Sequence, residues 1–107
     1  MTWNIEISKD AEQGLEEIES YIADTLLEPT TAEKQLHRIR DAIRKLDQFP
    51  LRYRVYEQEP WRTMGLRVLP VDNYVALYLP DEAKATVTII HIMYGGHDIV
   101  HQLTESE

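Results

Sequence analysis

The sequence feature that most constrains the fold is a pair of apolar stripes at helical spacing. A single helix cannot bury such a stripe by itself, so each stripe must pack against another part of the chain. Apolar residues recur every three or four positions over residues 11–26 and again over residues 32–46. The segment LLEPTTAEK interrupts the pattern, and within it Thr30 and Glu33 fit a capping box that would open the second helix. We therefore expect two helices that form an antiparallel hairpin across a short break.

Strand-like patterns lie on both sides of this hairpin. Residues 2–7 alternate between apolar and polar, and β-branched and aromatic residues concentrate in 65–71, 74–79 and 86–94. Residues 51–63 have no clean period and read as a long loop. The order strand, two helices, three strands predicts an α+β protein with the helical hairpin packed on one face of an antiparallel sheet.

Local signals refine this order. Ser8 is a plausible N-cap for the first helix. Pro70 favours the edge of the sheet for its strand, because proline cannot donate to a neighbouring strand. The long β-branched run over residues 86–94 predicts a central strand covered on both faces. A length of 107 residues fits a single domain over residues 1–107.

Charge is distributed unevenly along the chain, which carries a net charge of −8. Residues 1–28 hold one lysine and eight acidic residues, whereas residues 29–70 hold nine basic and five acidic residues. Overall acidity argues against free polyanion binding, although a local basic surface is compatible with the middle segment. The chain has no cysteine and no apolar run of membrane-spanning length, so we expect a cytoplasmic protein without disulfides and no membrane partner.

One motif near the end of the chain raises the question of a metal. His97-Asp98-Ile99-Val100-His101 comes close to H-E-x-x-H, in which two histidines one helical turn apart bind zinc. A catalytic zinc needs three protein ligands, and aspartate reaches about one methylene less than glutamate toward the bound water. His37 and His91 are the only other histidines. We therefore expect no metal and no other cofactor.

The ordered set of residues resembles the RelE/ParE superfamily of toxins from bacterial toxin–antitoxin modules, over nearly the whole chain. The matching positions are Ala11, Leu15, Ile18, Tyr21 and Ile22, then Leu46, Phe49 and Pro50, then Arg67, Leu69, Val71, Asn73, Tyr74 and Tyr78, and finally Val87, Ile89, Ile92, Tyr94, Gly95, His97 and Asp98. In this comparison His97 stands where the family usually carries arginine. The resemblance implies the same α+β fold.

The resemblance also implies a function, with alternatives that the sequence leaves open. Ribonuclease members cleave mRNA in the ribosome without metal, by attack of the 2′-OH on the adjacent phosphate. The ParE branch instead poisons DNA gyrase by binding it, and a third possibility is a toxin fold that has lost activity. Ribosome-dependent members are generally basic, so the acidity of this chain weighs against the nuclease. The partners implied are a cognate antitoxin and either the ribosome with its mRNA or gyrase; a homodimer is also open.

For the nuclease, three residues are candidates for catalysis. Arg67 would clamp a phosphate, the alternative being a strand-edge charge paired with an acid. His97, after two glycines, would exchange a proton with the substrate, the alternative being a capping or exposed histidine. His91 would do the same, although we expect it to share an apolar strand face with Val87 and Ile89, where histidines are usually hydrogen-bonded core residues.

Substrate contacts are predicted for a second set. Arg52, Arg54, Trp61 and Arg62 interleave cations with an aromatic ring, as single-stranded RNA recognition requires. Tyr94 could stack against a base. The alternative for all of them is a loop that folds over a small core.

Overall fold

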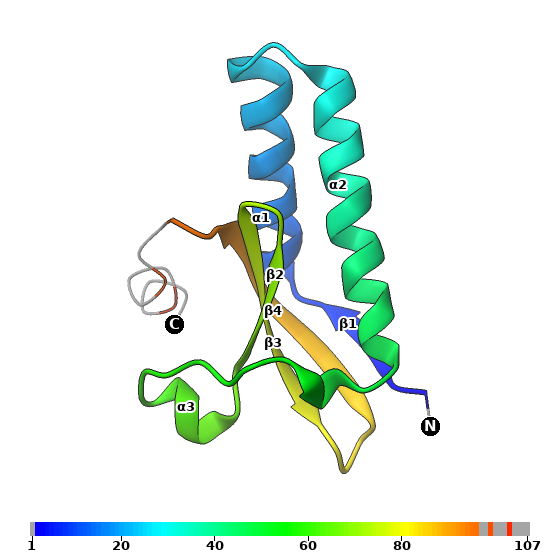
Figure 1. Cartoon of the computed structure of the whole chain (residues 1–107), viewed down its shortest axis with the longest axis vertical. Helices are drawn as coiled ribbons and strands as arrows, with labels where there is room; N and C mark the ends of the chain where they lie inside the picture. The colour runs from blue at the N-terminus through cyan, green and yellow to red at the C-terminus, as the bar shows by residue number, and fades with distance from the viewer. Residues whose placement is uncertain (1, 97–98, 100–102, 104–107) are drawn as a thin grey trace.

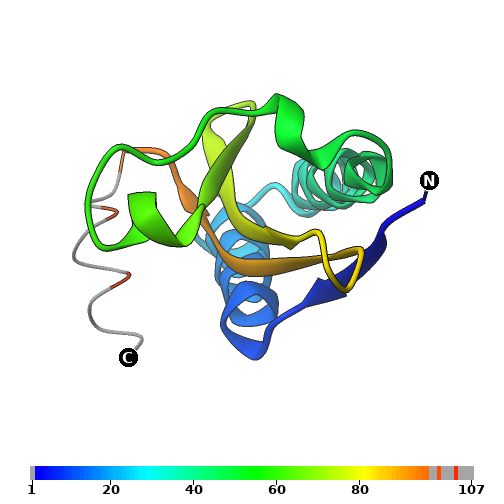
Figure 2. The same ribbon diagram turned by 90° about the horizontal axis from the view of Figure 1, so that it is seen from below.

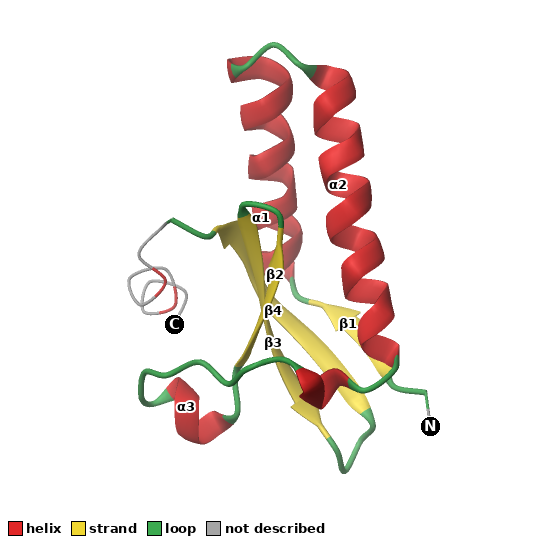
Figure 3. Ribbon diagram, viewed as in Figure 1, coloured by secondary structure: helices red, strands yellow, loops and turns green. Residues whose placement is uncertain are grey.

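The computed structural model describes residues 2–96, 99 and 103, and consists of a four-stranded sheet with a helical hairpin on one face (Figures 1 and 3). The elements in chain order are β1 (Asn4–Ile7), α1 (Lys9–Ser20), α2 (Pro29–Arg44), α3 (Trp61–Met64), β2 (Arg67–Val71), β3 (Tyr74–Asp81) and β4 (Thr86–Tyr94). A π-helical turn over Tyr21–Thr25 continues α1. The predicted α+β class and element order are confirmed.

The sheet has the order β1-β4-β3-β2 and is mixed. β2, β3 and β4 are antiparallel to one another, whereas β1 pairs in parallel with β4, from Asn4 opposite Thr86 to Ile7 opposite Ile89. The expectation of an antiparallel sheet therefore needs correction for β1. Alternation of side chains gives the period of a strand but not its direction, and parallel neighbours require a long crossover between them. β2 lies at the edge and β4 inside the sheet, as predicted.

The helix starts follow local chemistry. Ser8 caps α1, since its hydroxyl accepts from the Ala11 N–H at 3.1 Å and donates to the Ile90 carbonyl at 2.9 Å. α2 begins at Pro29, a residue suited to the first helical position, so the expected capping box at Thr30 does not form. No helix within the described ranges has the length and apolar character that a membrane span requires.

The main core lies between the hairpin and the sheet. Its fully buried members include Leu15 of α1, Ile39 and Ile43 of α2, and Ile89 of β4. Gly14 lets α1 lie directly against β4, because a Cβ there would lie 2.1 Å from the Ile92 carbonyl oxygen. The hairpin also extends past the end of the sheet (Figure 1).

A second, smaller core covers the opposite face of the sheet. The segment before β2, including α3, folds over this face, as Figure 2 shows from below. The buried members of this core are Tyr56, Trp61, Leu66, Val68, Leu77, Met93 and Leu103. After Gly96 the structure describes Ile99 and Leu103, and both contribute to this core. His97 and His101 lie outside the described residues.

A bulge in β4 changes which residues share a face. Tyr78 pairs with Ile89 but Leu77 pairs with His91, so Ile90 is the extra residue. His91 therefore lies on the Leu77 face and not beside Ile89, contrary to the expectation from simple alternation. This places the histidine at the boundary between the second core and the edge that α1 covers.

Candidate functional site

The cations of the basic middle segment are largely engaged within the fold. Four of them form ion pairs: Arg38 with Asp72 at 2.8 Å, Arg40 with Glu12 at 3.3 Å, and Arg44 and Lys45 with Asp41 at 3.8 and 3.4 Å. These pairs are exposed and contribute little stability each. They nevertheless engage four of the nine cations of residues 29–70, which reduces the positive charge available to a polyanion.

Arg67, at the start of β2, holds the preceding loop. Its Nη1 donates to the carbonyl oxygens of Leu51 at 3.0 Å and Tyr53 at 2.6 Å. Its Nε is buried and has no hydrogen-bond partner among the described residues. Part of the hydrogen-bonding capacity of the guanidinium is therefore used within the protein itself. Further side-chain hydrogen bonds hold the same loop.

Tyr78 and Arg52 fasten the same loop. The buried Tyr78 hydroxyl donates to the Pro50 carbonyl at 2.6 Å, and burial raises the pKa of Tyr78 to about 12. Arg52 donates from Nη1 to the Gln48 carbonyl at 2.6 Å, and its guanidinium lies 5.0 Å from the centre of the Tyr53 ring. Residues 48–53 are thus held by side-chain donors, which fits a structural role for this cluster.

The predicted substrate-contacting residues separate into two environments. Trp61 is only 9% exposed and packs 6.1 Å from the ring of Tyr56 in the second core. Arg54 and Arg62 are exposed, and neither forms an ion pair within the described part of the chain. The interleaved cations and aromatics therefore do not form one continuous surface, and the loop-over-core alternative describes Trp61 well.

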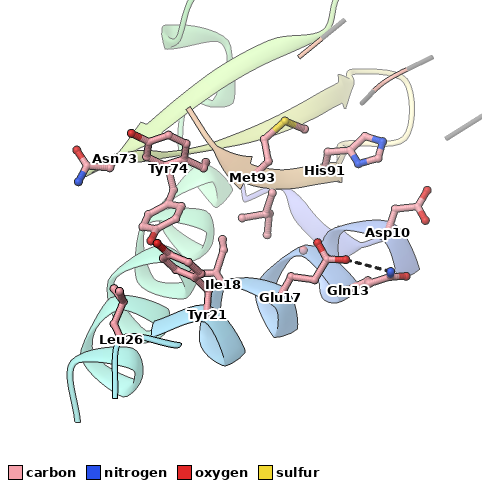
Figure 4. A pocket seen from close by; sticks show the side chains of 13 residues that line it. Asp10, Gln13, Glu17, Ile18, Tyr21, Leu26, Asn73, Tyr74, His91 and Met93 are labelled. Carbon is pink, nitrogen blue, oxygen red and sulfur yellow. Dashed lines mark hydrogen bonds between the residues drawn. The ribbon is translucent and has the colours of Figure 1, made fainter. Parts of the chain in front are cut away.

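A groove of about 760 Å³ runs between α1 and β4 (Figure 4). Along one part of it α1 presents Asp10, Gln13 and Glu17. Gln13 donates to Glu17 at 3.2 Å. Neither Asp10 nor Glu17 forms an ion pair with a described residue. This part of the groove is acidic and contains no compensating cation from the described chain.

The other part of the groove is aromatic. The Tyr74 and Tyr94 rings meet edge to face with centroids 6.1 Å apart, and Tyr21 of the π-helical turn stands beside them, 54% exposed. Burial raises the pKa of Tyr74, and Tyr21 and Tyr94 add to the effect. Leu26 completes this end, which offers apolar surface next to the acidic part.

His91 lines the groove from β4 and is 8% exposed. Its Nε2 is buried without a hydrogen-bond partner among the described residues. Burial lowers the pKa of His91, and the Asp10 carboxylate offsets this only in part, so the imidazole is neutral at pH 7. Within the described ranges, no three His, Asp or Glu side chains gather in a way that could hold a metal ion.

The structure thus brings together two of the predicted site residues, His91 and Tyr94, in one groove. Arg67 lies on β2, two strands away from β4, and His97 lies outside the described residues. Asp10 and Glu17 were not predicted, because the acids of this helix read as an ordinary solvated face. The available signal was their spacing of seven residues, which is two helical turns and places both on one side.

Comparison with known families gives a clear match. A family model described as "ParE toxin of type II toxin-antitoxin system, parDE" matches residues 5–99. Among curated proteins, no sequence matches the chain significantly.

Solved structures show the same fold at low identity. The chromosomal ParDE system from P. aeruginosa aligns with TM-score 0.72 and 18% identity, over 87% of this chain and 96% of that one. A mutant E. coli RelE toxin in the free state aligns with TM-score 0.63 and 12% identity, over 95% of this chain and 93% of that one. The RelBE2 toxin–antitoxin complex from Mycobacterium tuberculosis aligns with TM-score 0.61 and 18% identity, over 88% of this chain and 99% of that one. Since the family model spans most of the sequence, this chain belongs to the ParE toxin family of type II toxin–antitoxin systems, within the RelE/ParE superfamily.

Proposed function

We propose that this toxin acts by binding its target, DNA gyrase, and not by cleaving mRNA. The observation that carries the proposal is the use made of Arg67, the strand arginine expected to clamp a phosphate. Its guanidinium donates to the Leu51 and Tyr53 carbonyls. A phosphate clamp needs a bidentate face free for the substrate, and a group bonded into its own loop is poorly placed to stabilise growing transition-state charge.

The second expected proton-transfer group supports the same conclusion. A general acid or base must reach the reacting oxygen, and His91 is buried between the groove and the second core. Arg67 pairs with Tyr78 and His91 pairs with Leu77, so the two side chains lie on opposite faces of the sheet and are poorly placed to act on one phosphate.

Charge adds a further argument. A protein that enters an RNA-lined site gains affinity by releasing counterions from phosphates, which requires a surplus of cations. This chain has a net charge of −8, and four cations of its basic segment are paired with acids. A protein target imposes no such requirement.

We also assign the chain a cognate antitoxin as its partner, encoded by an adjacent open reading frame. The neighbours of known structure include toxin–antitoxin complexes such as the mycobacterial RelBE2 pair. An antitoxin segment that is disordered alone and folds on binding could cover a large part of a toxin this small.

The test separates the two target classes directly. Purified toxin should inhibit supercoiling by purified gyrase or trap cleaved DNA, and it should leave mRNA intact on translating ribosomes. Cuts in the ribosomal A site, with gyrase unaffected, would refute the proposal. Neither effect, from a folded protein, would indicate a toxin fold without activity.

A matched pair of variants sharpens this test. Arg67→Ala removes a cation from the loop, whereas Tyr78→Phe loosens the same loop without changing charge. If the toxin acts by binding gyrase, both variants should lose gyrase inhibition only in proportion to the fraction of protein that is unfolded. If the parent instead cleaves mRNA, loss of cleavage in a folded Arg67→Ala protein, with Tyr78→Phe fully active, would identify Arg67 as catalytic.

A further inference from the structure

α1 carries more negative charge than its own fold compensates. The helix and the π-helical turn after it hold six acidic residues and one lysine between Lys9 and Thr25. Of these acids, Glu12 alone forms an ion pair with a described residue. Acids late in a helix oppose its dipole, and the last turn of α1 has no basic residue. A cationic partner on α1 would relieve this arrangement.

Two of these carboxylates point to one place. Asp10 and Glu17 line the groove beside β4 (Figure 4). Glu16 and Glu19 of the same helix do not line it. A separation of seven residues corresponds to roughly 10 Å along a helix axis. The groove therefore presents two carboxylates in a row and ends at Tyr21, Tyr74 and Tyr94.

His91 gives an independent sign that the groove is incomplete. Its side chain is more than nine-tenths buried, lines the groove, and leaves Nε2 without a hydrogen-bond partner in the described part of the chain. Buried polar atoms in native proteins are nearly always hydrogen-bonded. Because Nε2 is itself buried, a polar group of a bound partner would satisfy this atom by drawing the imidazole toward the groove.

We propose that the groove between α1 and β4 binds a basic segment of the antitoxin, whose arginine or lysine side chains pair with Asp10 and Glu17. An apolar side chain of the same segment packs at the tyrosine end. Arginine suits both parts, because its planar guanidinium pairs with carboxylates and stacks on aromatic rings. This inference rests on the proposed antitoxin partner and adds where that partner binds and which chemistry it carries.

The segment cannot bind by adding a strand to β4 at this place. β1 ends at Ile7 opposite Ile89, but the strand edge beyond it is already covered by α1. Ser8 takes the Ile90 carbonyl, and Gly14 lies against the Ile92 carbonyl. The partner is therefore held by side chains, so its affinity depends on the groove carboxylates.

The experiment uses the purified toxin and the purified product of the adjacent reading frame, with affinity measured by calorimetry at two salt concentrations. The groove variant is Asp10→Asn with Glu17→Gln. The matched control is Glu16→Gln with Glu19→Gln, which removes the same two charges from the same helix outside the groove. Thermal melting establishes that each variant is folded.

We expect the groove variant to raise Kd by about 10-fold or more and to lose much of its salt dependence, with the control within about 2-fold of the parent. Equal losses in both pairs, or no loss in the groove variant, would overturn the groove assignment while leaving the antitoxin partnership intact. A parent toxin that fails to bind the neighbouring product at either salt concentration would overturn the partnership itself.

The tyrosine end offers a second, charge-neutral test. Tyr21 is 54% exposed, so Tyr21→Ala should keep the fold. It should weaken binding at high and low salt alike, because it removes apolar contact and no charge. Unchanged affinity would remove the tyrosine end from the proposed site.

Discussion

Gly14→Ala tests whether the close packing of α1 on β4 affects the free energy of unfolding more than helix propensity does. In an exposed helix this change would stabilise the protein by about 1 kcal/mol, since alanine is the better helix former. Here the added Cβ would lie 2.1 Å from the Ile92 carbonyl oxygen, closer than real Cβ contacts allow. The obstacle is backbone, so α1 must move away from the strand. Overpacking of this kind typically costs about 1–3 kcal/mol.

A 2.1 Å contact with backbone places the cost at the upper end of this range, about 2–3 kcal/mol, so the net loss is about 1–2 kcal/mol, or roughly 4–16 °C in Tm for a domain of this size. Urea unfolding followed by circular dichroism measures the change. Glu16→Ala, on the exposed side of the same helix, is the control and should stay within about 0.5 kcal/mol of the parent. A Gly14→Ala protein more stable than the parent would show that α1 does not lie against β4 as described.

Four further predictions concern Tyr78, Asp72 and Arg67. Tyr78→Phe should cost about 1–3 kcal/mol in urea unfolding, because a buried carbonyl loses its donor. Because the pKa of Tyr78 is raised to about 12, the parent should lose stability as the pH rises from about 10 to 12, and Tyr78→Phe should not share this loss. Arg38 holds the pKa of Asp72 below its ordinary value of 3.8, so the parent should lose stability as the pH falls below that value, and Asp72→Asn should lose less. Arg67→Ala should cost about 1–2 kcal/mol and speed proteolysis of the loop before β2, both measurable on the purified protein.

Periodicity and capping chemistry predicted most of the fold. The helical stripes, the Ser8 cap and the central position of the strand over residues 86–94 are all found in the structure. The direction of β1 and the β4 bulge at Ile90 escaped prediction for a shared reason. Both depend on which strands become neighbours in space, and a single sequence records the pattern of a strand but not its partner.

The candidate site was less predictable. Arg67 lies on β2, within the stretch predicted as a strand, but the loop carbonyls that it contacts lie 14 and 16 residues away in the sequence. The acids of the groove looked like any solvated helix face until β4 was placed against α1. Residue type thus indicated which groups could act, whereas burial and neighbours decide which of them face a partner.

The parallel pairing of β1 with β4 also sets the order in which the molecule can assemble during synthesis. Asn4 waits for Thr86, which a ribosome adds about 80 residues later, or several seconds at about 5–20 residues per second. From the completion of α2 at Arg44 until β4 is made, the hairpin has no complete sheet on which to bury its apolar stripes. Contacts this distant in sequence also slow folding. A chain that stops before β4 should therefore be an aggregation-prone fragment without toxin activity, and the fold closes only once its last strand has been made.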